Sequence, residues 1–404
     1  MAYFNFLHTH CRVLSFGILL TLFSSFGQTF LISLFVPGIL ETFSLNPAQF
    51  GSLYAAATLV SAACLPFFGR LIDRMPLRPF SLSVGIGLTL ACLAMAFAFN
   101  VPALFLALLG LRLTGQGLLS LTASTTMARE FEDGRGRALS VSGLGYPLGE
   151  GLLPLLIVYL MQAADWRMSW GIQGGVIALV LLPAMNSLVG EKEAYQGGAK
   201  ETDRTGFRTR MLFRDWRFYA LLPGNLFLPM ALTGLFLYQG LLAGESGFSL
   251  QAMGAAFVGF AVARLTASLA IGPLIDRWSA MRLFPFILLP VAAGMAFLWK
   301  GPLFLAPFAF LALAGMSQGI AGPTMTALWA EIYGSASLGA IKGMVASMSI
   351  FATALGPLLI GWLLLVEISF SVIVPACAML ALGVAGLGLS LQKKISNLKL
   401  SRRV

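Results

Sequence analysis

Long apolar runs follow one another along the whole chain, separated by short segments that contain Pro, Gly and charged residues. A helix needs about 20 apolar residues to cross the hydrocarbon core of a membrane, and each of these runs is close to that length. We therefore predict six membrane spans in the first half, near residues 13–36, 50–69, 80–99, 102–127, 138–161 and 169–189. We predict six more spans in the second half, near residues 218–240, 251–272, 283–299, 302–328, 340–365 and 369–391.

One long polar segment separates the two sets of spans. Residues 190–217 contain seven Lys or Arg and five acidic residues. The predicted organisation is an N-terminal six-helix bundle (1–189), a cytoplasmic central loop (190–217), a C-terminal six-helix bundle (218–391) and a basic cytoplasmic tail (392–404). The predicted fold class is an all-α membrane protein with twelve transmembrane helices in two bundles. We expect a monomer.

The composition is that of a chain almost entirely immersed in lipid. Of the 404 residues, 58% are hydrophobic and only 10% are Asp, Glu, Lys or Arg, against about 25% in soluble domains. The mean hydropathy is +0.86. These values exclude a soluble enzyme and a secreted domain. The first span, from Val13 to about Leu40, is too long for the core of a signal peptide, so we expect it to be retained.

The net charge of +10 is explained by topology. Of the 26 Lys and Arg residues, 22 lie on the side that holds both termini and the central loop. The positive-inside rule makes that side cytoplasmic, so no nucleic-acid partner is needed. We expect an integral protein of a bacterial inner (plasma) membrane with both termini in the cytoplasm.

Enzyme chemistry is not indicated anywhere in the sequence. The four cysteines show no CxxC spacing and the two histidines, His8 and His10, precede the first span, so we predict no metal site, no cofactor and no disulfide framework. No lysine is followed by Ser or Thr, which excludes a GxxxxGK[ST] phosphate loop and transport driven by the chain's own ATP hydrolysis.

The two halves repeat a short motif at a spacing of 203 residues. GRLIDRMPLR (Gly69 to Arg78) corresponds to GPLIDRWSAMR (Gly272 to Arg282), and the two share the LIDR core. An even number of spans per half gives both copies the same direction through the membrane. We therefore expect two pseudo-symmetric bundles related by an axis along the membrane normal, with a cavity between them.

GRLIDRMPLR also resembles the loop signature of the major facilitator superfamily, although Pro76 and Leu77 replace residues typical of that signature. The resemblance covers the whole chain and implies a carrier in which two halves rock around a central site. We expect each motif aspartate to accept hydrogen bonds at the N-terminus of a neighbouring helix and so to latch the cytoplasmic face. Alternatively, the aspartates only end their helices and bind adjacent arginines. The candidate gating residues are Gly69, Asp73, Arg74, Arg78, Gly272, Asp276 and Arg277.

Three ionisable residues lie near the middle of predicted spans, where charge is costly and usually functional. Arg112 and Arg264 are permanent cations, and Glu150 is a carboxylate that can exchange a proton. Because guanidinium groups bind carboxylates in bidentate fashion, we predict that both arginines bind a small organic anion while Glu150 couples its movement to a proton. Polar side chains that could complete the substrate site are Gln28, Tyr146, Asn225, Tyr238 and Gln318.

The segment from Ala261 to Arg264 is similar to the arginine-bearing helix of monocarboxylate transporters and oxalate/formate antiporters. This resemblance implies that Arg264 binds a substrate carboxylate. Two structural alternatives remain open: Arg112 and Glu150 form a buried ion pair, and Arg264 binds backbone carbonyls.

The sequence thus predicts a secondary transporter for a monocarboxylate-like anion that works by proton symport. The alternatives are a proton-coupled exporter of hydrophobic or cationic compounds, with Glu150 as the binding charge, and a non-transporting sensor built on a carrier fold.

Overall fold

The computed structural model describes residues 2–72, 74–131, 134–189, 212, 214–299, 304–334 and 338–401, and within these ranges the regular structure is helical. Ten of the described helices are long and apolar enough to cross a membrane, or eleven if the bent pair Cys11–Gly27 and Thr29–Phe43 is one span. The predicted all-helical membrane fold is confirmed. The chain divides into two compact units, Met1–Glu201 and Thr202–Val404.

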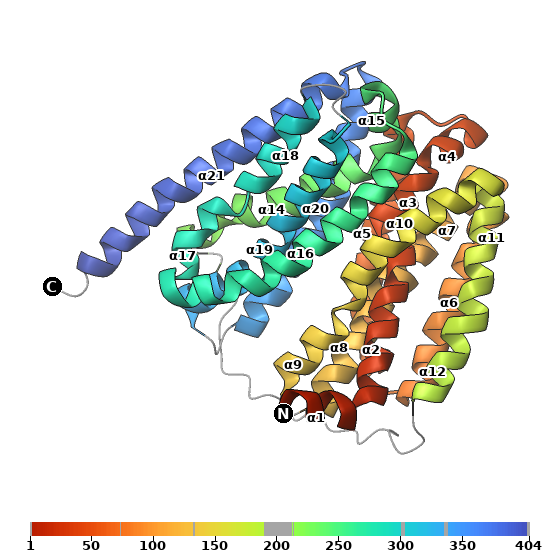
Figure 1. Cartoon of the computed structure of the whole chain (residues 1–404), viewed down its shortest axis with the longest axis horizontal. Helices are drawn as coiled ribbons and strands as arrows, with labels where there is room; N and C mark the ends of the chain where they lie inside the picture. The colour runs from red at the N-terminus through yellow and green to blue at the C-terminus, as the bar shows by residue number, and fades with distance from the viewer. Residues whose placement is uncertain are drawn as a thin grey trace. The chain divides into compact units, whose positions relative to one another are not determined.

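The N-terminal unit runs from α1 to α12 (Figure 1, red to yellow-green). A short helix, α1 (Ala2–Thr9), precedes a first span made of several pieces: α2 (Cys11–Phe23), η1 (Ser24–Gly27), α3 (Thr29–Ile32), η2 (Ser33–Phe35) and α4 (Val36–Phe43). The later spans are α5 (Pro47–Ile72), α6 (Leu77–Ala96), α7 (Val101–Gly110) with η3 (Leu111–Leu119) and α8 (Ser120–Glu130), α9 (Arg135–Ser142) with α10 (Gly145–Ala163), and α11 (Trp166–Val176) with η4 (Ile177–Leu181) and α12 (Leu182–Leu188).

The C-terminal unit begins its spans with α14 (green in Figure 1) and ends with α21. Its helices are α14 (Trp216–Leu237), α15 (Gln239–Ser246), α16 (Leu250–Trp278), α17 (Ala280–Leu283), η6 (Phe284–Phe286), α18 (Leu289–Trp299), α19 (Ala306–Tyr333), α20 (Leu338–Leu365) and α21 (Phe370–Ser401). Helix α21 continues beyond residue 391, where the last span is predicted to end. Most of the predicted central loop, residues 190–211 and 213, lies outside the described residues.

The predicted span at 302–328 corresponds to α19, which is not among the ten or eleven apolar helices. It is 28 residues long, and Ser317, Gln318 and Pro323 lie in its middle. These residues reduce its hydropathy relative to its neighbours, although its length is sufficient for a span. It packs lengthwise against α16, the most extensive helix pairing of its unit.

Glycines let several spans approach backbone to backbone. On α19, a Cβ atom at Gly315 or Gly319 would overlap the carbonyl oxygen of Phe260 or Arg264 on α16. On α10, a Cβ at Gly145 would overlap the Ile18 carbonyl oxygen on α2. Small residues permit this close packing, which is a common means of helix association in membranes. Both contacts fix helices that carry candidate site residues.

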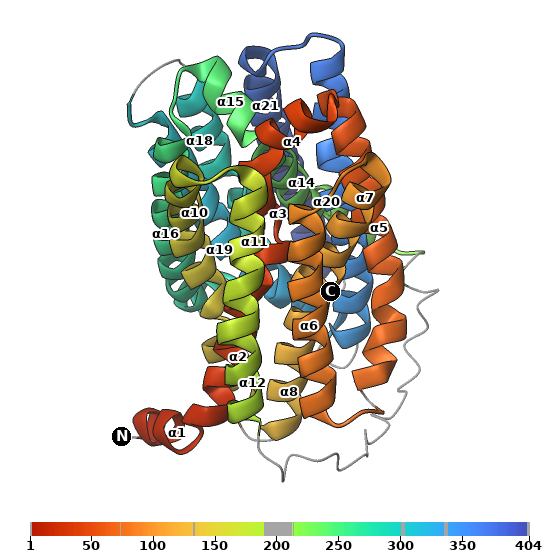
Figure 2. The same cartoon turned by 90° about the vertical axis from the view of Figure 1, so that its right-hand side faces the viewer.

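Helix ends away from the site are satisfied by local side chains. Asp165 caps α11 by accepting a hydrogen bond from the Met168 N–H at 2.7 Å. The adjacent Arg167 donates from Nη1 to the carbonyl oxygens of Ala96 and Ala98 at 3.2 and 2.5 Å, and thereby stabilises the C-terminus of α6. The view in Figure 2 shows α6 and α11 running side by side.

Candidate functional site

The first span is interrupted at Gly27 and Gln28. Gln28 has extended backbone angles (φ −85°, ψ 150°) between η1 and α3, and the two parts of the span are inclined by 46°. A break of this kind removes helical hydrogen bonds, so nearby carbonyl groups need other donors. Gln28 itself is half-buried, whereas the residues on either side of it are buried.

Arg112 supplies the donor at this break. It lies in η3, a π-helical segment of the fourth span, and its side chain is only 2% exposed. Its Nη1 donates to the Gly27 carbonyl oxygen at 3.1 Å and its Nε donates to Thr58 Oγ1 at 3.1 Å. The guanidinium also stacks 5.1 Å from the centre of the Tyr54 ring.

The groups around Arg112 are themselves ordered. The Tyr54 hydroxyl and Thr29 Oγ1 are 2.7 Å apart and form a hydrogen bond, which joins α5 to α3 just after the break. Arg112 therefore ties together the first, second and fourth spans. Its hydrogen-bonding partners in the described part of the chain are Gly27 and Thr58 rather than Glu150, so the ion pair considered from the sequence is not the arrangement found.

Glu150 lies at the same depth of the N-terminal unit. It is 9% exposed on α10. A Cβ at the preceding residue, Gly149, would overlap Ser25 Oγ in η1, so Glu150 is held at the level of the broken first span. The N-terminal unit thus places a buried carboxylate and a half-buried amide, that of Gln28, on adjacent helices.

Arg264 is the middle residue of the 29-residue helix α16. Its side chain is half-buried, and its backbone carbonyl oxygen is the atom that leaves no space for a side chain at Gly319. Gln318, half-buried, is the residue before that glycine. The structure therefore brings Arg264 and Gln318 onto two tightly packed helices of the C-terminal unit.

The other polar candidates make bonds between helices or lie at a partly exposed position. Asn225 Nδ2 is 3.5 Å from Ser349 Oγ, and the Tyr238 hydroxyl donates to the Pro357 carbonyl oxygen at 3.2 Å. The first bond joins α14 to α20, and the second joins Tyr238, the residue directly after α14, to α20. Tyr238 is fully buried, whereas Tyr146, near the start of α10, is half-buried.

The gating residues of the first half are partly described. Asp73 lies outside the described residues. Arg78 donates from Nε and Nη2 to Asn186 Oδ1 at 2.8 and 2.6 Å, and so holds the start of α6 to the end of α12. Arg74 is exposed, and Gly69 is half-buried at the end of α5.

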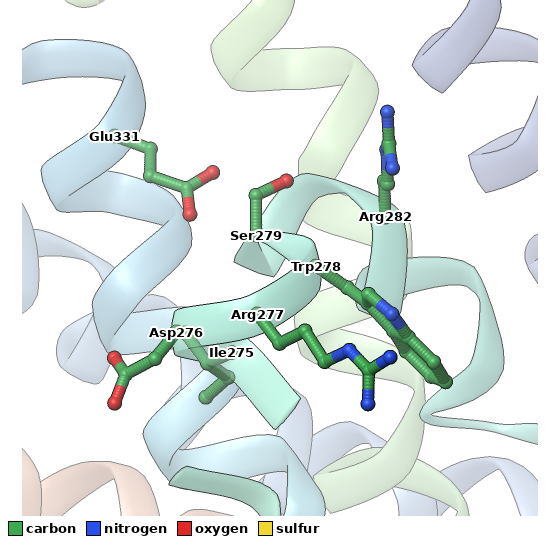
Figure 3. A pocket seen from close by; sticks show the side chains of 7 residues that line it. All are labelled: Ile275, Asp276, Arg277, Trp278, Ser279, Arg282 and Glu331. Carbon is green, nitrogen blue, oxygen red and sulfur yellow. The ribbon is translucent and has the colours of Figure 1, made fainter. Parts of the chain in front are cut away.

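In the second half, the helix N-terminus beside Asp276 is capped by a residue that the sequence analysis missed. Glu331 Oε1 and Oε2 accept hydrogen bonds from the N–H groups of Ala280 and Met281 at 2.7 and 3.2 Å; the Glu331 side chain is drawn in Figure 3. Glu331 is 55 positions after Asp276 in the sequence, so no local spacing could have indicated this contact.

Asp215, at the N-terminus of α14, is a second missed charge. It accepts hydrogen bonds from the N–H of Arg217 at 2.9 Å and from its Nε, and its Oδ2 lies 2.9 Å from Arg217 Nη2. Partial burial raises the pKa of Asp215, but the hydrogen bonds and charge of Arg217 outweigh this effect and hold the pKa below its ordinary value. The pair therefore stabilises the start of α14 in its charged form.

Helices long and apolar enough to cross a membrane, gathered in two compact units, are typical of membrane carriers. The sequence matches the family model of the Major Facilitator Superfamily over residues 18–249, which is more than half of the chain. The protein belongs to this superfamily, and it is a secondary transporter rather than an enzyme. No curated protein sequence is matched by the chain.

Solved transporters share the fold. The nucleoside transporter NupG superposes with a TM-score of 0.74 and 14% sequence identity, over 94% of this chain and 98% of that chain. A bacterial homologue of the human lysosomal transporter Spinster, in an inward-facing and unoccupied conformation, gives a TM-score of 0.69 and 15% identity, over 95% of this chain and 94% of that chain. At such identities the similarity concerns the fold alone. The monocarboxylate subgroup and the cytoplasmic orientation of the termini stay predictions.

Proposed function

We propose that this transporter moves a small organic anion of the monocarboxylate class together with a proton, by alternating access. The observation that carries the proposal is Arg264, half-buried at the centre of α16. A guanidinium remains charged at physiological pH. A charged side chain in the middle of a membrane span usually pairs with another group or lines a substrate pathway. A carboxylate is the substrate group that its planar, two-pronged geometry fits best.

The environment of Arg112 supports a division of labour between the two arginines. The guanidinium of Arg112 is committed to Gly27, Thr58 and the Tyr54 ring. We therefore assign Arg112 to the maintenance of the first span and Arg264 to the substrate. Gln28, Tyr146 and Gln318 remain the polar candidates for the substrate's other groups because each is half-buried.

Glu150 is the proposed site of the coupled proton. Its carboxyl group is buried in α10 beside the break of the first span, and carboxyl groups at this depth of a span commonly serve as proton relays in transporters. In this mechanism Glu150 binds a proton before the anion is carried, so the net charge that crosses the membrane is reduced. The gating motifs at Gly69–Arg78 and Gly272–Arg282 are the proposed latches of the cytoplasmic face.

Ligand binding by the purified protein tests the substrate class. Thermal unfolding is measured with a panel of small carboxylates, nucleosides and hydrophobic cations; nucleosides are included because NupG is a nucleoside transporter. We expect a carboxylate to raise the melting temperature of the wild type in a saturable manner and to lose that effect in Arg264→Ala. Arg135→Ala is the matched control, because Arg135 is an exposed arginine at the start of α9 and lies outside both gating motifs.

The same panel separates the other candidate functions. Stabilisation by hydrophobic cations that depends on Glu150, with no response to carboxylates, would support an exporter with Glu150 as the binding charge. Stabilisation by a carboxylate that persists unchanged in Arg264→Ala would contradict the assignment of Arg264.

A further inference from the structure

Beside the turn between α16 and α17 lies a cavity of about 550 Å³ that is largely open to the protein surface. It is lined by Ile275, Asp276, Arg277, Trp278, Ser279, Arg282 and Glu331 (Figure 3). These residues belong to the second copy of the repeated motif and its surroundings. Six of them lie at or just after the end of α16, 11 residues or more beyond Arg264, and Glu331 lies near the end of α19, so the cavity is separate from the proposed substrate site.

The first copy of the motif is built differently. There, Arg78 is held by Asn186 through two hydrogen bonds. The second copy is one residue longer between its glycine and its last arginine, and Ser279 adopts a positive φ of 73° in the turn, a conformation uncommon for residues other than glycine. Among the residues that the structure describes, none accepts a hydrogen bond from Arg277 or from Arg282, the counterpart of Arg78.

The charges around the cavity are segregated. Glu331 is engaged by the N–H groups of Ala280 and Met281. In Figure 3 the side chains of Asp276 and Glu331 point to one side of the turn, whereas those of Arg277, Trp278 and Arg282 lie on the other. The second side therefore carries two exposed guanidinium groups; they point in different directions in Figure 3, so both side chains would have to turn toward one anion to hold it.

An apolar surface adjoins the arginines. Leu274 and Trp278 are 36% and 46% exposed, and their spacing of four residues puts them on one face of α16. Tryptophan is enriched where a membrane protein meets the lipid headgroups. The cavity thus has two arginines on one side and a neighbouring apolar surface suited to acyl chains.

We propose that this cavity binds the headgroup of an anionic phospholipid. Arg277 and Arg282 contact the phosphodiester, the Ser279 hydroxyl donates to the headgroup, and the acyl chains lie along Leu274 and Trp278. Basic side chains near a membrane surface favour anionic lipids, and the fork of a guanidinium matches two phosphate oxygens. The bound lipid would fix the turn that carries the second gating motif.

Short-chain lipids added to the purified full-length protein test this assignment. The thermal unfolding midpoint is followed during titration with dioctanoyl phosphatidylglycerol, with dioctanoyl phosphatidylcholine, and with inorganic phosphate. We expect saturable stabilisation by phosphatidylglycerol alone. Replacement of each arginine should weaken its apparent affinity by about fivefold, and of both by about 25-fold, from the contribution typical of one basic residue near an anionic surface.

The control variant is Arg74→Gln, which removes the same charge at the corresponding position of the first motif. It should leave the phosphatidylglycerol titration unchanged, and native mass spectrometry should show lipid retained by wild type and R74Q but not by R277Q/R282Q. Equal stabilisation by inorganic phosphate would identify a free-anion site instead and overturn the lipid assignment. So would equal stabilisation by phosphatidylcholine, an unaltered affinity in R277Q/R282Q, or an equal loss in R74Q.

Discussion

Arg112 and Arg264 are both arginines in the middle of a span, but the structure surrounds them differently. The side chain of Arg112 is sealed between Gly27, Thr58 and Tyr54, whereas that of Arg264 is half-buried. The sequence predicted both as substrate ligands because each has the same depth and the same chemistry. The distinction depends on segments 54 and 85 positions away from Arg112, which periodicity and spacing do not bring together.

Replacement of Arg112 should reduce stability. Arg112→Lys keeps the positive charge but cannot reach both Gly27 and Thr58, and a hydrogen bond from a charged donor is worth about 2 kcal/mol. We expect the melting temperature to fall by about 4–8 °C, as a loss of that size predicts for a unit of about 200 residues. The measurement is thermal unfolding in detergent, with Arg135→Lys, at an exposed arginine, as the control. A melting temperature equal to that of the control would show that Arg112 does not stabilise the break in the first span.

At the scale of elements, the contact between α16 and α19 determines where Arg264 and Gln318 lie. Gly319→Val would drive its side chain into the Arg264 carbonyl oxygen, and overpacking of this kind costs about 1–3 kcal/mol. We expect a lower melting temperature and weaker carboxylate binding. Gly322→Val, on the same helix, is the control because a Cβ atom at Gly322 would meet no neighbouring atom within 4 Å. Equal effects of the two substitutions, measured by thermal unfolding with and without ligand, would show that the close approach is unimportant.

The N-terminus of α14 should make stability sensitive to acid. Because the pKa of Asp215 is lowered in the folded protein, its contribution is present above its unfolded value of about 3.9 and is lost as the pH falls through the lower folded value. We expect Asp215→Asn to lower the melting temperature slightly at pH 7, since water screens this partly exposed pair. The difference should shrink as the pH falls below about 3.9, the unfolded value, and disappear once the pH is below the lowered folded pKa.

The sequence predicted spans more successfully than breaks within them. Apolar length located the ten or eleven described helices that are apolar enough to cross a membrane, because hydrophobicity dictates which segments enter lipid. The break at Gln28 and the π-helical segment around Arg112 were not predicted. Both are stabilised by contacts between spans, such as the bond from Arg112 to the Gly27 carbonyl oxygen, rather than by local propensity. The helix caps made by Glu331 and Asp215 show the same limit for charged side chains. Glu331 caps a helix that is distant in the sequence, and the Asp215–Arg217 pair is of a kind common on protein surfaces, so neither cap was predicted.

At the scale of the whole molecule, the duplication seen in the sequence has a counterpart in packing. In the N-terminal unit, α10 approaches α2 through Gly145, and in the C-terminal unit α20 approaches α14 where Gly356 leaves no space beside the Met230 carbonyl oxygen. The fifth span thus packs on the first as the eleventh packs on the seventh. Repeated close pairings make each unit suited to move as a rigid body, which is what alternating access requires.

Flux through reconstituted protein is the most direct test of an anion carrier coupled to protons. Proteoliposomes that contain a pH-sensitive dye and face an inward proton gradient are given the carboxylate selected by the binding panel, and both carboxylate uptake and internal acidification are followed. We predict uptake that is driven by the gradient and accompanied by acidification. Arg264→Ala should reduce uptake at least tenfold, because the loss of one bidentate charge-assisted contact costs about 1.5–3 kcal/mol. Glu150→Gln should retain carboxylate binding but lose the acidification. Carboxylate uptake of wild-type rate in Arg264→Ala, or no uptake of any carboxylate by the wild type, would contradict the account.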